Sequence, residues 1–344
     1  MSERDNECWY EVTAPTRTAD VGGWTDTWFA AAGAVCNVAL GHRARVVIRI
    51  RSAPTDRIRL VVAMTGDDDV FDPDDPPGRH HIIEPMIVAM RPSGEVTVWI
   101  DDDIVAGSGL GTSASVMVAL VAGLATAAGA PLEAGDVAQR AHRFEIATGK
   151  QSGVQDHWAA ACGGLNLFDV RYPDVVRTEL SVPAVAAADL GARLHTVYFG
   201  RPHVSSELHD RVIERLEAGG DVGCLDVMRA AAVTAADALV AGDLDAYGRA
   251  LTRSHDAMAA LQRDLVGVHA RGLVELARSV GARGWKANGA GGAGGSMAVL
   301  GPADAAADAR LLALIDANGW ACIPGDIGAA GVVVERVSPP TGRA

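Results

Sequence analysis

The chain has 344 residues, of which 49% are hydrophobic and 21% are charged, as is ordinary for a folded protein with room for two domains. Its formal net charge of −13 argues against a general binder of nucleic acid or of anionic membranes, so a phosphate-bearing ligand must be held by main-chain groups, a few cationic side chains and metal. The five cysteines are odd in number and lack metal-ligand spacing, and the N-terminus lacks the apolar core of a signal peptide. We therefore expect a cytoplasmic globular protein with reduced thiols.

The N-terminal third of the chain is predicted to be rich in strands. Val46, Ile48 and Ile50 alternate with other residues, which is typical of a strand with one buried face. The Asp- and Pro-rich segment 65–79 is expected to be a solvated loop rather than a metal site. Strands are expected within 11–27 and at 35–40, 44–50, 58–64 and 95–100, and a helix is expected at 82–90.

Helices dominate the rest of the predicted elements. The Ala- and Pro-rich segment 180–192 interrupts the pattern, so we place a domain boundary there, between residues 188 and 189. The mixture of elements favours two α+β layers over an alternating βαβ chain. Helices are expected at 116–128, 133–148, 154–162, 205–218, 225–241, 244–265, 268–280 and 303–317, and strands at 165–170, 194–199, 296–300 and 331–337.

The most informative stretch runs from Val105 to Ser115. Its alternating glycines let the main chain turn tightly and let a ligand approach closely, and Thr112-Ser113 behind them is typical of a helix start. Free N–H groups at a helix N-terminus form a site for phosphate. A Walker loop would need a lysine that is missing here, and a dinucleotide fingerprint is disfavoured by the three aspartates before the loop. A plain glycine turn before a core helix stays the alternative.

Two further stretches have an unusual composition. Arg17 precedes a turn at Gly22-Gly23 that continues as Trp24-Thr25-Asp26-Thr27, and an arginine and a carboxylate around a tight turn could hold a polar ligand. A surface salt bridge beside a hairpin is its alternative. The segment 286–296 is rich in glycine and alanine. Ordering such a segment before a strand costs conformational entropy, which suggests that it has a function. A flexible linker is the alternative.

In this order and at these separations, the three stretches resemble the three motifs of the GHMP kinases, which include galactokinase and the homoserine, mevalonate and phosphomevalonate kinases. The first motif has a form that resembles L-fucokinase and D-glycero-D-manno-heptose 7-phosphate kinase. The segments 153–157 (Gly-Val-Gln-Asp-His) and 163–166 (Gly-Gly-Leu-Asn) are similar to the same sugar-kinase branch. The third stretch departs from the family pattern at Ala293 and Ser296.

This resemblance implies an α+β, two-domain GHMP kinase fold. Residues 1–188 would form an N-terminal domain like the second domain of ribosomal protein S5, with the phosphate loop at 105–115. Residues 189–344 would form a ferredoxin-like C-terminal domain with the glycine-rich motif at 289–295. ATP and Mg²⁺ are the implied cofactors, and the implied partner is a small-molecule sugar or sugar phosphate, with a homodimer left open.

The resemblance also assigns roles to single residues. Asp156 would be the general base, because an aspartate in the first turn of a helix is ionised at neutral pH and can accept a hydroxyl proton; a helix-capping role is the alternative. Arg17 would pair with Asp156 and face the transferred phosphate. Ser113 and Glu145 would hold Mg²⁺, unless Glu145 lies on a solvated helix face.

Nucleotide and acceptor contacts follow from the same comparison. Asp26 would accept hydroxyl groups of a sugar, and Trp24 would pack against its apolar face unless it belongs to the core. The nucleotide would contact Gly107, Gly109, Leu110, Gly111, Thr112, Ser113, Gly289, Gly291 and Gly292, and the acceptor would contact Gly23, Trp24, Asp26 and Asp156.

We therefore predict an ATP- and Mg²⁺-dependent kinase that phosphorylates the anomeric hydroxyl of a sugar to give the sugar 1-phosphate. A heptose 7-phosphate is favoured over a neutral sugar of the L-fucose type. A phosphate on the acceptor would need a basic pocket, for which Lys150, Arg201 and His203 are the candidates. The alternatives are a sensor that binds sugar and ATP without catalysis and a mevalonate- or homoserine-type acceptor, which the Trp24-Thr25-Asp26 sequence disfavours.

Overall fold

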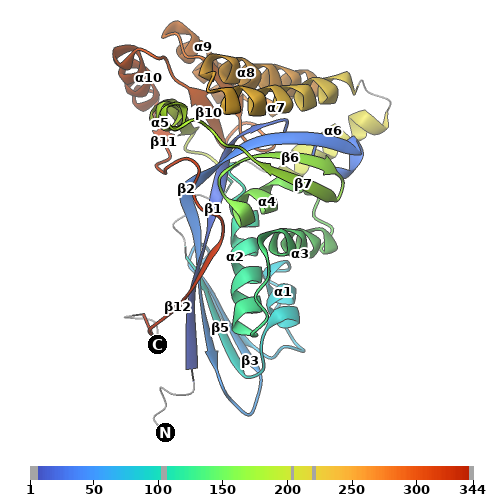
Figure 1. Cartoon of the computed structure of the whole chain (residues 1–344). Coiled ribbons are helices and arrows are strands. Elements are labelled where there is room, and N and C mark those ends of the chain that lie inside the picture. The colour runs from blue at the N-terminus through green and yellow to red at the C-terminus, as the bar shows by residue number, and fades with distance from the viewer. Residues whose placement is uncertain (1–6, 102–106, 203–204, 219–221, 341–344) are drawn as a thin grey trace.

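The computed structural model describes residues 7–101, 107–202, 205–218 and 222–340. They form two β-sheets with helices packed against each (Figure 1). The first sheet has eight strands in the order β12-β1-β2-β5-β3-β4, with β6 paired to β2 and β7 to β6. The second sheet has four strands in the order β11-β8-β10-β9. None of the helices in these ranges is long and apolar enough to cross a membrane.

Two long antiparallel strands organise the first sheet. β1 (Glu7–Val21) pairs with β2 (Ala32–Arg51), and the register shifts after Pro15 and after Thr18. The two strands expected at 35–40 and 44–50 are thus one strand, and its two ends pair with different neighbours, β6 and β5. The other strands are β3 (Arg57–Val62), β4 (Asp67–Phe71), β5 (Glu95–Ile100), β6 (Leu165–Arg171), β7 (Asp174–Glu179) and β12 (Val333–Val337).

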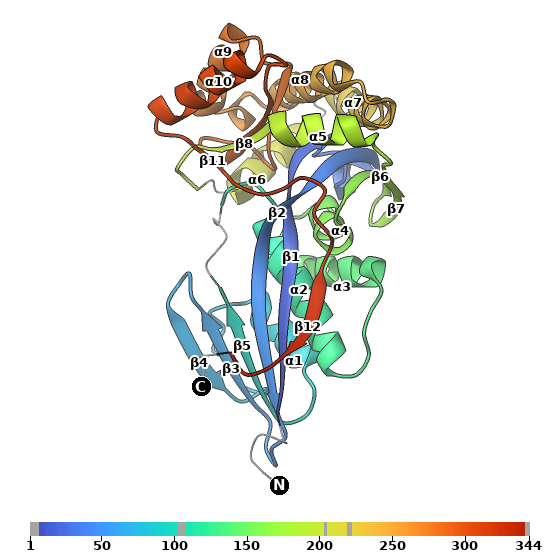
Figure 2. The same cartoon turned by 60° about the vertical axis from the view of Figure 1, so that its left-hand side comes forward.

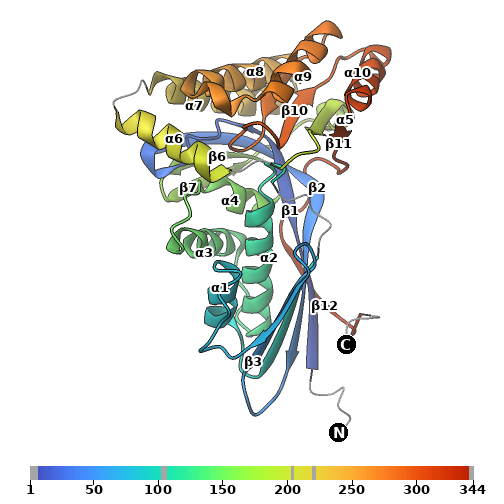
Figure 3. The same cartoon turned by 180° about the vertical axis from the view of Figure 1, so that it is seen from behind.

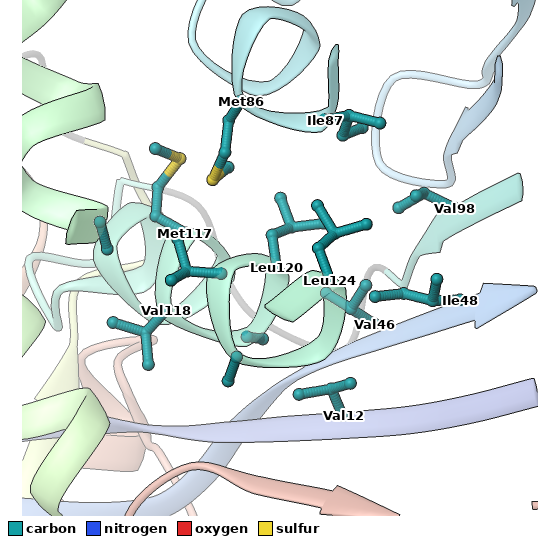
Figure 4. Close-up of a cluster of buried hydrophobic side chains, with 14 of the residues drawn as sticks. Val12, Val46, Ile48, Met86, Ile87, Val98, Met117, Val118, Leu120 and Leu124 are labelled. Atoms are coloured by element: carbon teal, nitrogen blue, oxygen red, sulfur yellow. The ribbon is translucent and has the colours of Figure 1, made fainter. Parts of the chain in front are cut away.

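Helix α2 (Thr112–Ala127) lies at the centre of the first core. It is apolar nearly all round because the sheet covers one side and other helices cover the rest. Leu120 and Leu124 point toward α1, between that helix and the sheet (Figure 4). A Cβ on Gly123 would lie 2.6 Å from the side chain of Ile48, so the glycine permits the close approach of α2 to the sheet. The neighbouring helices are α1 (Ile83–Met90), α3 (Ala134–Ala147) and α4 (Gln155–Cys162).

The second sheet separates two further cores. Met297 and Val299 of β10 face α9 and α10, whereas Ala298 and Leu300 face a cluster that includes α5, α7, α8 and the ends of β1 and β2. The helices of this half lie together at the end of the molecule opposite β3 (Figure 3). Its strands are β8 (Leu194–Tyr198), β9 (Gly284–Ala287), β10 (Ser296–Leu300) and β11 (Ala321–Cys322). Its helices are α5 (Ala184–Arg193), α6 (Ser205–Glu217), α7 (Gly223–Ala241), α8 (Leu244–Leu261), α9 (Val268–Ser279) and α10 (Ala305–Ala317).

The C-terminal strand returns to the first sheet. β12 pairs antiparallel with β1, with Val334 opposite Val12 (Figure 2). A part of segment 189–344 therefore completes a sheet whose other strands come from 1–188, and α5 spans the junction between 188 and 189. The division of the chain into domains at this junction remains a prediction.

The short strands β4, β7, β9 and β11 are absent from the expected elements. β4 lies inside the segment 65–79, so the expectation of a loop is wrong there. Arg59 of β3 donates to Asp68 of β4 at 2.8 Å, and this cross-strand ion pair lets an aspartate-rich segment form an edge strand.

Candidate active site

A cavity of about 200 Å³ opens between the N-terminus of α2, the turn after β1 and the segment that leads into α4. Gly289 and Ala290, from the loop after β9, contribute to its wall. All three glycine-containing stretches therefore meet at one place, together with the segment around Asp156. Val105 and Ala106 of the predicted phosphate loop lie outside the described residues.

The predicted phosphate loop turns through three glycines with left-handed backbone angles. Gly107, Gly109 and Gly111 have φ values of 68°, 79° and 73°. Gly111 immediately precedes α2, and among the described residues no side chain caps this helix end, so its N-terminus is presented to the cavity. Leu110 is buried, and its carbonyl accepts the Arg17 N–H at 3.0 Å, which anchors the loop to β1.

Arg17 and Asp156 form the expected ion pair. Arg17 Nε donates to Asp156 Oδ1 at 2.8 Å, and a second guanidinium nitrogen of Arg17 donates to the carbonyl of Gly109. Burial alone lowers the pKa of Arg17, but the carboxylates of Asp156 and Asp20 raise it above its usual range. Asp156 keeps a side chain 29% exposed toward the cavity, so it can meet a ligand while it is oriented by the buried arginine.

Asp26 supplies the cap of α4. Its Oδ2 accepts the Gln155 N–H at 3.0 Å, and its carbonyl accepts the Val154 N–H at 3.2 Å. The capping role considered for Asp156 therefore falls to Asp26, which leaves Asp156 paired with Arg17 instead. Burial raises the pKa of Asp26 to about 6.

The two residues predicted to hold a metal lie side by side. Ser113 Oγ donates to Glu145 Oε1 at 3.2 Å, and Glu145 is buried rather than on a solvated helix face. Burial alone raises the pKa of Glu145, but His157 and Lys150, which contact its two oxygens, hold it well below its usual range. One hydroxyl and one ionised carboxylate beside a phosphate loop are a donor set that fits Mg²⁺.

Asp20 and Lys286 form a buried ion pair behind the cavity that the sequence analysis missed. Both side chains are fully buried, and Lys286 Nζ lies 3.6 Å from Asp20 Oδ1. The other oxygen of Asp20 accepts Gln155 Nε2 at 3.4 Å and the Gly289 N–H at 3.1 Å, which joins β1, α4 and the third glycine stretch. Burial lowers the pKa of Lys286. Composition offered a signal, because the sequence has only two lysines, Lys150 and Lys286, and both contact carboxylates of this site.

Of the remaining predicted residues, some line the cavity and others lie behind its wall. Trp24 lines the cavity, but its ring packs in a core cluster with residues of α7 and α8 such as Met228 and Met258. Gly23 lies against Asp20, whose Oδ2 would be 2.7 Å from a Cβ there. Gly291 and Gly292 lie behind the wall, where the Gly292 N–H donates to the carbonyl of Leu265 at 2.8 Å.

The candidates for a basic pocket do not converge. Lys150 lines the cavity and is paired with Glu145, whereas Arg201 is exposed and is not part of the described wall. His203 lies outside the described residues. The departures from the family pattern are tolerated locally, because Ala293 is exposed and Ser296 Oγ accepts Asn288 Nδ2 at 3.0 Å.

One stretch of the chain matches the model of a known protein family. Residues 81–164 match the family model described as the GHMP kinases N terminal domain. The mevalonate kinase of Pyrococcus furiosus is 29% identical over 212 residues, which span 60% of this chain and 60% of that protein. The mevalonate kinase of Thermococcus gammatolerans is 27% identical over 248 residues, which span 71% of this chain and 70% of that protein.

Solved structures share the fold at lower identity. A D-glycero-D-manno-heptose 1-phosphate kinase from Bacteroides thetaiotaomicron superposes with a TM-score of 0.74 at 18% identity, covering 96% of this chain and 100% of its own. The galactokinase of Lactococcus lactis in complex with galactose gives 0.72 at 17% identity, with 94% and 95% covered. The phosphomevalonate kinase of Streptococcus pneumoniae in complex with phosphomevalonate and AMPPNP gives 0.74 at 15% identity, with 95% and 99% covered.

Proposed function

Since the chain carries a GHMP kinase N-terminal domain and has the GHMP kinase fold, we propose that it is an ATP-dependent kinase that phosphorylates the anomeric hydroxyl of a sugar. The observation that carries this proposal is the position of the Arg17–Asp156 pair, which lies at the N-terminus of α2 and lines the same cavity as Asp26. A phosphate loop, an oriented carboxylate and a second carboxylate for hydroxyl groups are the parts that phosphoryl transfer to a sugar needs.

Each part has a task in the reaction. Main-chain N–H groups at the start of α2 bind the nucleotide phosphates, and Arg17 adds positive charge where negative charge develops on the transferred group. The oxygen of the acceptor hydroxyl forms a bond to the γ-phosphorus while the bond from this phosphorus to ADP breaks. Asp156 accepts the proton of that hydroxyl. Ser113 and Glu145 would hold Mg²⁺, which when bound neutralises phosphate charge.

The acceptor end of the cavity is acidic. Asp20 and Asp26 contribute to its wall, and the two cations of the described wall, Arg17 and Lys150, are each paired with a carboxylate. Carboxylates accept hydrogen bonds from hydroxyl groups but repel anions. This wall favours a neutral sugar over the heptose 7-phosphate that the sequence resemblance put first, and it also disfavours mevalonate, which carries a carboxylate.

Replacing Asp156 tests the assignment of the base. Asp156→Asn keeps the shape of the side chain but removes its ability to take a proton, so we expect the turnover number to fall by about 10²–10⁴-fold. Nucleotide affinity, measured by isothermal titration calorimetry, should stay within a few-fold of the original protein. Asp169→Asn, at an exposed aspartate of β6, is the matched control and should turn over normally. Normal turnover by Asp156→Asn would show that another group takes the proton.

A further inference from the structure

The chain uses lysine at two positions only. Its lysines and arginines total 30, and all but Lys150 and Lys286 are arginine. Lys286 is fully buried beside Asp20, whereas the side chain of Lys150 is 38% exposed and belongs to the segment between α3 and α4. Lys150 is therefore the one of the two whose ammonium group has room to move.

The ammonium of Lys150 contacts both oxygens that were assigned to the metal. It contacts Glu145 Oε1 and lies 3.3 Å from Ser113 Oγ. Glu145 has its second oxygen 3.2 Å from His157 Nε2, so Lys150 is the partner on the cavity side of a carboxylate that is only 2% exposed. A cationic side chain of the protein thus occupies the position that fits a divalent cation.

The ammonium and a divalent cation compete for these oxygens. Both need the lone pairs of one carboxylate oxygen, and the repulsion between them is twice that of two unit charges at the same distance. Lysine carries a compact charge on a flexible four-carbon stem, unlike the planar fork of arginine. Because Lys150 lines the same cavity as the phosphate loop, nucleotide phosphates offer its ammonium a second set of oxygens.

We propose that Lys150 is a resident cation of the metal site. It holds Ser113 and Glu145 together while no metal is bound, and it exchanges these oxygens for those of the nucleotide phosphates when a divalent cation binds. Lys150 is therefore a competitor of the metal in the empty enzyme and a positioning residue for the phosphates in the loaded one. This inference rests on the proposed function, because it requires a metal–nucleotide complex in this cavity.

Binding of Mn²⁺ to the full-length protein, followed by the electron paramagnetic resonance signal of the free ion, tests the competition without any turnover. In the absence of nucleotide, Lys150→Met should bind Mn²⁺ about fivefold to tenfold more tightly than the original protein, because a unit charge in contact with the ligands has been removed. Lys150→Gln, a second neutral variant, should do the same. Lys150→Arg keeps the charge and should stay near the original affinity. Arg140→Met removes an exposed charge of α3 and is the matched control.

A second measurement tests the proposed contact of Lys150 with the nucleotide phosphates when a metal is bound. With Mn²⁺ saturating, Lys150→Met should bind a non-hydrolysable ATP analogue several-fold more weakly, as measured by calorimetry. Unchanged or weaker Mn²⁺ binding by both neutral variants would overturn the inference while leaving the metal assignment intact, provided that Glu145→Gln abolishes Mn²⁺ binding. If Glu145→Gln binds Mn²⁺ normally, the metal assignment is overturned, and the proposal for Lys150 with it.

Discussion

At the scale of single residues, Asp26 combines a structural contact with a proposed role in binding the acceptor. Its carboxylate caps α4 and lines the cavity, yet it is almost completely buried near Asp20 and Asp156. Burial raises its pKa from 3.8 in the unfolded chain to about 6 in the fold. The unfolded chain therefore releases this proton first, so the fold loses stability relative to the unfolded chain as the pH rises from 3.8 to 6.

Asp26→Asn should remove this pH dependence and stabilise the protein. The amide oxygen can still cap α4, and no charge is buried. The free energy of unfolding, measured in urea, should therefore rise by about 3 kcal/mol at about pH 8 and by about 1 kcal/mol at about pH 4.5. The same variant should bind the acceptor sugar more weakly because one carboxylate acceptor is lost. An equal gain at both pH values, or a loss of stability at pH 8, would show that the ionised carboxylate of Asp26 does not destabilise the fold.

Contacts between site residues were predictable where a motif carries the residues and obscure where it does not. Arg17, Ser113, Glu145 and Asp156 each lie in a recognisable stretch, and the structure brings the first and last together and the middle two together. The pairs of Lys150 with Ser113 and Lys286 with Asp20 have no local signature, because the partners are far apart in the sequence and meet only in the folded chain.

At the scale of elements, helix α2 has the proposed phosphate loop at one end and an ordinary turn at the other. Gly111 precedes its first residue with φ 73°, and Gly129 follows its last turn with φ 76°. A Cβ at position 111 would lie 3.1 Å from Cγ of Asp156, whereas a Cβ at position 129 would meet nothing within 4 Å. The two glycines share a positive φ that would strain any residue with a Cβ, but they differ in what that Cβ would touch.

Alanine at these two positions separates strain from displacement of Asp156. Gly111→Ala and Gly129→Ala should each lower the free energy of unfolding by about 1–2 kcal/mol, because a non-glycine residue is strained at positive φ. Only Gly111→Ala should also lose most of its turnover, since the new methyl group must push Asp156 away. Urea unfolding and an ADP-release assay measure the two effects. Similar turnover in both variants would argue against a functional contact between the loop and Asp156.

The long helices and the central strands were predictable because their apolar patterns are long, and the short or polar elements were not. β9 has four residues and β11 two, too few to show a period. β4 is aspartate-rich and is stabilised by the cross-strand ion pair between Arg59 and Asp68, which a local pattern does not reveal. Most of the segment 180–192, where we expected an interdomain boundary, lies in the helix α5. Its alanines have a high intrinsic helix propensity.

At the scale of the whole molecule, the two sheets are tied together through the site. β12 completes the first sheet, Asp20 of β1 pairs with Lys286 of β9, and Thr196 of β8 donates to Thr18 of β1 at 2.9 Å. The return of β12 could not be predicted, because an edge pairing between distant segments depends on the completed fold. The resemblance did assign residues of all three glycine-containing stretches to nucleotide or acceptor contacts, and residues from each stretch line one cavity.

These ties should make the two sheets unfold together. Hydrogen exchange followed by mass spectrometry, in increasing urea, should give the same opening free energy for peptides from β2 and β5 as for peptides from β8 and β10. Separate values for the two sets would instead support two independent domains that divide near residue 188.

The account depends most on the identity of the phosphorylated group. The decisive measurement is incubation of the protein with ATP, Mg²⁺ and a panel that contains neutral hexoses and heptoses, a heptose 7-phosphate, mevalonate and homoserine, followed by ³¹P NMR of the products. We predict ADP and an equal amount of a sugar that bears phosphate on its anomeric oxygen, with a neutral sugar as the better acceptor. Phosphorylated mevalonate or homoserine, or sugar binding without release of ADP, would contradict the account.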